Sequence, residues 1–201
     1  MRRRTFDVIA STIGLGLAAL LLVAGGLLTW AHGFVGDQVH AQLSEQKIFF
    51  PPKGSDAIKE LPAADAAAMN KYAGQQLTTG DQAATYANHF IRIHLQGIGG
   101  GKTYSELSGA AMKDPNNQKL QGQVATMFKG ETLRGLLLNA YAFGKMGVIA
   151  GIGAIVAWLG GALFALLGAL GLWHAHRVPV EQEVLTGKTV KQTRTEPAIA
   201  D

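Results

Sequence analysis

Residues 147–173 decide the fold: they read GVIAGIGAIVAWLGGALFALLGALGLW and contain no charged side chain. As an α-helix, a run of this length spans roughly 40 Å, more than the about 30 Å hydrocarbon core of a bilayer. Small residues recur at every fourth position, namely Gly153, Ala157, Gly161, Ala165 and Ala169. Lipid tails give no hydrophobic drive between helices, so a small-residue face matters because it lets another backbone come close. The stretch therefore predicts a membrane span with a helix-packing face.

A second uncharged apolar run lies near the N-terminus, at 8–31, directly after an arginine-rich start. A charged residue at mid-membrane costs about 2.5–3.5 kcal/mol, so its absence from so long a run predicts another membrane span. The small residues of this run are Ala10, Gly14 and Ala18, and the two spans can pack on each other, on a partner, or both. A cleaved secretory signal and a twin-arginine export signal are the alternatives. We favour a retained span because secretory signals have shorter apolar regions, of about 7–15 residues.

Charged residues that flank the two runs predict the orientation of the chain. Arg2, Arg3 and Arg4 should remain in the cytoplasm, and Arg177 follows the second run. Aromatic residues gather at membrane interfaces, so we expect Trp30 at the outer interface and Trp173 at the inner one. That layout, in the cell membrane, is a cytoplasmic N-terminus (1–7), a first span (8–31), an extracytoplasmic domain (32–146), a second span (147–173) and a cytoplasmic tail (174–201).

The extracytoplasmic region carries helical signals and no convincing strand pattern. We expect an extension of the first span that ends before Pro51 and Pro52, because proline lacks the backbone N–H. The further helices are expected at about 62–74, 79–96, 103–112, 118–128 and 131–145, with stops at Gly97 and 99–101, a capping box from Thr103 to Glu106, and a turn at 114–116. The fold class is therefore an all-α membrane protein, with two transmembrane helices flanking a small helical extracytoplasmic domain.

The tail beyond Arg177 is polar and is expected to be disordered. Its threonines at 186, 189, 193 and 195 lie among basic residues, where an added phosphate would reverse the local charge. We favour a solvated tail over a phosphorylated one.

Motifs for catalysis or ligand binding are weak in this chain. The absence of cysteine excludes disulfides and thiolate sites. The segment 101–103 (GKT) resembles a phosphate-binding loop, but the glycine that this motif needs at 96 is a glutamine. Basic residues of the extracytoplasmic region are interspersed with acids, so no nucleic-acid surface is expected. We expect no catalytic, cofactor-binding or metal-binding residue.

Histidines leave one alternative open. His89 and His94 are five residues apart, about 140° around a helix, so they do not converge on one ion as a zinc-protease pair would. A site with two histidines and one carboxylate needs only three such groups. It could combine His32 or His40, His89 or His94, and Asp37 or Asp81 after folding.

Several segments between the spans also carry a family resemblance. They are KIFFPP (47–52), GDQAATYANHFIRIHLQGI (80–98), TYSELS (103–108) and QGQVATMFKGETLRGLLLNAYAFG (121–144). With the arginine-rich start and the two spans, this arrangement resembles a family of two-span envelope proteins of high-GC Gram-positive bacteria. Members of that family carry the label of an aromatic ring-opening dioxygenase subunit. The resemblance therefore implies either an envelope protein or an iron-dependent enzyme.

We expect a non-enzymatic integral membrane protein, an accessory, assembly or scaffold component of a larger envelope or respiratory membrane complex. Its expected partners are the lipid bilayer and other integral membrane proteins, or a second copy, through the small-residue faces. The alternative function is an extracytoplasmic metal-dependent enzyme, in line with the dioxygenase label, or a small-ligand binder.

Overall fold

The computed structural model describes residues 3–177, so the predicted disordered tail and its threonines lie outside the described residues apart from 174–177. Helices account for 83% of this part of the chain and it contains no strand, which confirms the all-α class. In chain order the helices are α1 (Arg3–Glu45), α2 (Asp56–Lys59), α3 (Ala63–Asn70), α4 (Gly80–Tyr86), the π-helical η1 (Ala87–Ile91), α5 (Arg92–Gly99), α6 (Tyr104–Lys113) and α7 (Gln118–Arg177).

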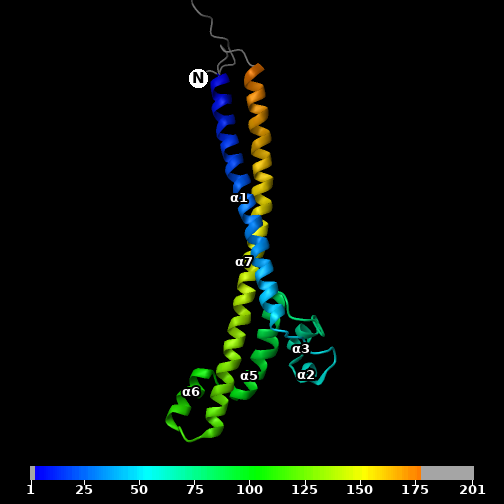
Figure 1. Ribbon diagram of the computed structural model, residues 1–201, viewed down its shortest axis with the longest axis vertical. Coiled ribbons are helices and arrows are strands. Elements are labelled where there is room, and N and C mark those ends of the chain that lie inside the picture. The colour runs from blue at the N-terminus through cyan, green and yellow to red at the C-terminus, as the bar shows by residue number, and fades with distance from the viewer. Residues whose placement is uncertain (1–2, 178–201) are drawn as a thin grey trace, which may run out of the picture. The chain divides into compact units, whose positions relative to one another are not determined.

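The described chain divides into two compact units (Figure 1). One, the span unit, comprises residues 3–29 and 151–177; the other, the helical domain, comprises 30–150. Both long helices contribute to both units, α1 with 43 residues and α7 with 60. The short helices all belong to the helical domain.

Within the span unit, α1 and α7 lie side by side (blue and yellow-orange in Figure 1). Both helices are long and apolar enough to cross a membrane. Only 17% of the most apolar stretch of each is buried within the chain. A core helix of a water-soluble protein would bury most of such a stretch, so these helices leave an apolar surface for another environment.

Helix α7 is continuous where the sequence predicted a break between 128 and 131, and residues 174–177, assigned to the tail, form its last turn. The predicted break was wrong, and Gly130, which lies within it, is a contact site in a continuous helix. A Cβ placed on Gly130 would collide with the Leu95 side chain of α5. Packing of α5 against α7 thus explains the glycine, and tertiary contact offsets its low helix propensity.

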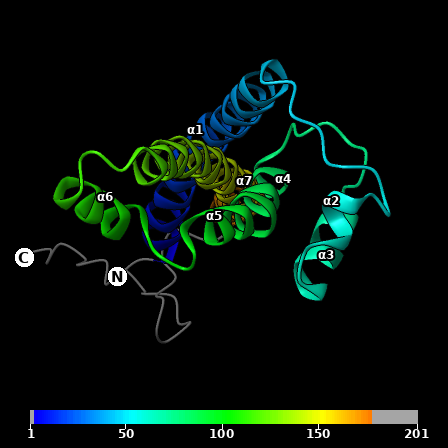
Figure 2. The same ribbon diagram turned by 90° about the horizontal axis from the view of Figure 1, so that it is seen from below.

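The helical domain has one hydrophobic core, whose largest fully buried side chains are Phe50, Ile58, Met69 and Leu77. Seen from below in Figure 2, α2 and α3 lie on one side of α4 and α5, and α6 lies on the other, beyond α7. The segment that contains Phe50 connects α1 to α2. Its backbone N–H donates to the Gln75 carbonyl oxygen (2.9 Å), and the pairing amounts to an isolated antiparallel bridge.

The predicted helix at 79–96 is longer and less regular than expected. It begins with a capping box in which Thr79 and Gln82 bond each other's backbone N–H, and it passes through the π-helical turn η1. It ends at Gly99 and not near Gln96, because the first left-handed residue is Gly100 (φ 59°). The capping box predicted for Thr103 and Glu106 is confirmed.

Candidate functional site

The predicted packing residues lie on the facing sides of α1 and α7 only in part. Ala18 is 2% exposed and Ala157 is 5% exposed. Of the others, Gly161 is buried, and Gly14, Gly153 and Ala165 are half-buried. Ala10 and Ala169 are exposed and make no seam in this chain.

Buried positions of the span unit instead repeat every seventh residue and form what we call the span seam. Its members are Ser11, Ala18 and Gly25 on α1, and Ala154, Gly161, Gly168 and Ala175 on α7, with Ala157 beside them. Seven residues rotate a helix by about 700°, only about 20° short of two whole turns. Four residues rotate it by about 400°, about 40° more than one turn. A four-residue stripe from 153 to 169 therefore winds about 160° around α7 and leaves the interface.

The span seam brings two backbones into contact. A Cβ on Gly161 would lie 3.4 Å from the Ala18 carbonyl oxygen, and one on Gly168 would lie 3.1 Å from that of Ser11. The two helices are therefore antiparallel and in a fixed register. Glycine is required here because any larger residue would push the helices apart.

One polar contact adds to the span seam. The indole Nε1 of Trp158 donates to the Thr29 hydroxyl oxygen (3.1 Å), and this hydroxyl donates to the Gly25 carbonyl oxygen (2.7 Å). The Trp158 ring lies against Gly25, where a Cβ would be 3.2 Å from it. The hydrogen bond to Thr29 and the contact with Gly25 fix the orientation of Trp158, whose side chain is half-exposed.

Another face of α1 remains without a partner in the described chain. Nothing between residues 3 and 177 comes within 4 Å of a Cβ placed on Gly16 or Gly26. Gly16 and Ala19 are exposed, and Gly26 is half-buried, about 100° around α1 from Gly25 of the span seam. A helix from another protein could approach this face closely.

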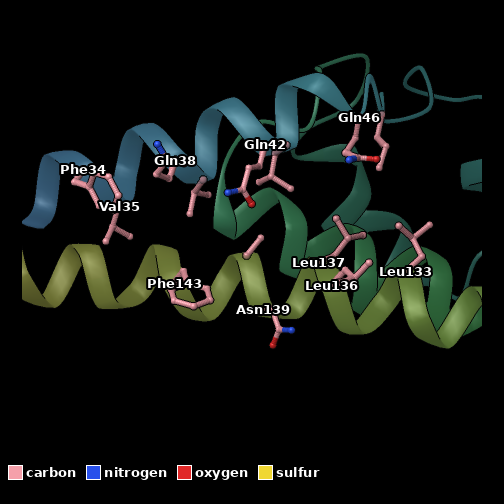
Figure 3. A pocket seen from close by; sticks show the side chains of 14 residues that line it. Phe34, Val35, Gln38, Gln42, Gln46, Leu133, Leu136, Leu137, Asn139 and Phe143 are labelled. Atoms are coloured by element: carbon pink, nitrogen blue, oxygen red, sulfur yellow. The ribbon is translucent and has the colours of Figure 1, made fainter.

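In the helical domain, an apolar groove of about 550 Å³ runs between α1 and α7 (Figure 3). Its floor is part of the hydrophobic core, since Leu43 and Leu137 are 5% and 3% exposed. None of its lining residues is charged; they are Phe34, Val35, Gln38, Val39, Gln42, Leu43, Gln46, Ile48, Leu133, Leu136, Leu137, Asn139, Ala140 and Phe143. Periodicity alone had indicated a helical extension here, and the groove appears only when the two helices are brought together.

A smaller hollow of about 320 Å³ brings together part of the predicted histidine site, namely His32, His40 and Asp81. The carboxylate of Asp81 is already engaged by Lys145 (2.8 Å), and this hydrogen bond raises the pKa of the lysine. The His32 ring donates from Nδ1 to the Gly147 carbonyl oxygen (2.7 Å). Asp37 is not part of the lining.

The two other histidines lie elsewhere in the helical domain. His89 is in η1 and donates from Nδ1 to Oδ1 of Asp65 (2.7 Å), whose side chain is 11% exposed. Arg92 approaches the same carboxylate oxygen at 3.6 Å. His94 bonds its own helix, through the Phe90 carbonyl oxygen. The structure thus separates the predicted histidine pairs, and among residues 3–177 no three His, Asp or Glu side chains could hold one metal ion.

The Asp65–His89 pair is the most enzyme-like arrangement in the described chain. A carboxylate that binds one ring nitrogen of histidine fixes the ring and leaves the other nitrogen as a base or a ligand. Single π-helical turns inside α-helices often occur at functional sites, and η1 contains His89. The sequence analysis missed Asp65; its only local signal is that it is the one acid in the alanine-rich helix α3.

Comparison with protein-family models, curated proteins and solved structures gives no match. Function therefore has to be argued from the span seam, the open face of α1, the apolar groove and the Asp65–His89 pair.

Proposed function

We propose that this chain is a two-span integral membrane protein with both termini in the cytoplasm, and that it works without catalysis as an accessory, assembly or scaffold component of a larger envelope membrane complex. The support is chemical. The uncharged apolar runs of α1 and α7 expose most of their surface, and arginines flank the ends of the two spans that are expected in the cytoplasm.

The observation that carries the proposal is the open face of α1. The two spans already pack against each other along the span seam, which includes Ala18 and Gly161. Gly16 and Gly26 are not needed for that pairing, because no described residue lies within 4 Å of their Cβ positions. A glycine in a helix interior costs roughly 1 kcal/mol relative to alanine, and a close partner helix would offset that cost.

A matched pair of leucine substitutions tests this proposal. Gly26→Leu adds a side chain where α7 does not approach within 4 Å, whereas Gly161→Leu replaces a residue of the span seam and places a side chain against Leu22 of α1. We expect wild-type protein, extracted in a mild detergent, to migrate in native gels as a complex of defined partners. Gly26→Leu should lose those partners and keep its fold by circular dichroism. A wild-type monomer in every mild detergent, or unchanged partners in Gly26→Leu, would contradict the proposal.

Orientation in the membrane is tested separately. Alkaline phosphatase is active outside the cytoplasm and green fluorescent protein is fluorescent inside it. Both are fused in turn after Asp201, and after a residue of the helical domain such as Asn116. The proposal expects fluorescence for the C-terminal fusion and phosphatase activity for the internal one. The reverse pattern would overturn the topology.

The Asp65–His89 pair favours a second candidate, a metal-dependent enzyme of the helical domain. A single oriented imidazole would need at least two further ligands from water, substrate or a partner. Metal analysis of purified protein distinguishes the candidates. Stoichiometric iron that is lost in His89→Ala, but kept in His94→Ala, would favour the enzyme over the scaffold.

A further inference from the structure

The apolar groove between α1 and α7 has a ligand chemistry of its own. We propose that it holds the aliphatic chain of a membrane lipid. The inference goes beyond the scaffold function and rests on it only for placing the chain in a membrane. Three properties of the groove lead to it: charge, cross-section and hydrogen-bonding capacity.

The lining carries no charged group. Its polar atoms are side-chain amides; Gln38 and Gln42 lie four residues apart on α1, and Gln46 follows directly after its last residue. In Figure 3, Gln42 reaches from α1 toward α7, while Asn139 points away. An ionised ligand group would lose its hydration in the groove and gain no ion pair. The occupant is therefore uncharged over the length of the groove.

Its size excludes a helix. From Phe34 to Gln46, α1 advances about 18 Å at 1.5 Å per residue. Even the whole empty space of the groove, about 1280 Å³ with open solvent included, gives a mean cross-section of only about 70 Å² over that length. A helix with its side chains, 10–12 Å across, needs roughly 80–110 Å². A partner helix or a second copy of this chain could cover the groove but not fill it.

An extended peptide would fit the cross-section but not the chemistry. Each of its residues brings a backbone N–H and a C=O that must be hydrogen-bonded when buried. Both walls of the groove are α-helices, whose own backbone groups are bonded within the helix. The few side-chain amides of the lining cannot pair a whole peptide. A hydrocarbon chain brings no polar group and needs no such partner.

The groove starts close to the expected membrane surface. Phe34 follows Trp30 by one helical turn, and the two rings stack with centroids 5.4 Å apart. Trp30 is the residue expected at the outer interface. Phe34 and Phe143, which line this end of the groove, are 50% and 56% exposed. These exposed aromatic side chains therefore form an apolar path from the outer interface to the groove.

Photolabelling tests the proposal. The full chain is reconstituted in phosphatidylcholine vesicles in which one 16-carbon acyl chain ends in a diazirine; after irradiation, labelled peptides are mapped by mass spectrometry. We expect label in the spans and in the groove peptides at 34–48 and 133–143. Ala140→Phe fills the groove and should lower groove labelling about ten-fold or more, with span labelling unchanged. Ala142→Phe, at an exposed position on α7, is the matched control and should change neither.

A second variant guards against misfolding of Ala140→Phe. Gln42→Glu is nearly isosteric and exposed, and it places a charge on the groove edge, so it should also reduce groove labelling. Labelled spans with an unlabelled groove, or groove label that survives both variants, would overturn the inference and leave the scaffold function standing. Unlabelled spans would instead overturn the membrane placement. A groove that cross-links to a second copy of the chain would assign it to dimerisation and overturn the lipid.

Discussion

An engineered disulfide across the span seam is the sharpest test of how α1 and α7 pair. A Cβ placed on Gly171 lies 3.3 Å from the Cβ of Ser11. Disulfides join Cβ atoms about 3.5–4.5 Å apart, so a shift of a few tenths of an ångström suffices. We therefore expect the double variant Ser11→Cys, Gly171→Cys to form an intramolecular disulfide. The natural chain has no cysteine to compete.

The expected stabilisation follows from the loop that the bond closes. Joining 11 to 171 encloses about 160 residues, which gives an upper bound of about 5 kcal/mol in the chain-entropy account. The oxidised protein should unfold at a higher temperature than the same protein after reduction. Both samples carry the same two substitutions, so the difference in unfolding temperature reports the disulfide alone. It should disappear when reductant is added to the oxidised sample.

The assay is non-reducing gel migration of the purified protein after treatment with copper phenanthroline. The control combines Gly171→Cys with Ile13→Cys, two residues along α1 and about 200° around it. Ile13 is 59% exposed and faces away from the span seam. Equal oxidation of the two pairs, or disulfides that form only between molecules, would refute the antiparallel register of the span seam.

Three further predictions concern the helical domain. Gly80→Ala should lower the unfolding free energy by about 1–3 kcal/mol, because its Cβ would lie 3.1–3.4 Å from backbone atoms of α7. The control is Gly122→Ala, whose Cβ would lie in open space and which should be neutral or stabilising by up to about 1 kcal/mol. Hydrogen exchange measured by mass spectrometry compares the two variants. Hydrogen bonds from Thr103, the N-cap of α6, lower the pKa of Glu106. This capping box should therefore persist above pH 4.5 and be lost as the pH falls through the lowered pKa. Glu106→Gln should keep the capping box, as Gln82 does in α4, and should remove the pH dependence of the NMR shifts of the capping-box amides. Met69→Ala should cost about 2–5 kcal/mol in thermal unfolding, since Met69 is 0% exposed; a loss below 1 kcal/mol would show that the core can collapse around the cavity.

The local interactions of the chain were readable from sequence. Two uncharged apolar runs predicted the long helices α1 and α7, and the capping box at Thr103 and Glu106 placed the start of α6. These features depend on residues only a few positions apart, so a one-dimensional pattern contains them. The helix end near Gln96 was misplaced because the first residue with positive φ is Gly100, and the sequence does not show which of several glycines takes that conformation.

Tertiary structure decided the functional surfaces, because each joins residues far apart in the chain. The span seam repeats every seventh residue, as two packed helices require, and so excludes part of the four-residue stripe from Gly153 to Ala169. The pairing of Asp65 with His89 and the groove between α1 and α7 depend on how helices meet. Sequence alone therefore determined that this chain has two apolar helices around a helical domain. Only the fold determined which faces those helices use on each other and which they leave open.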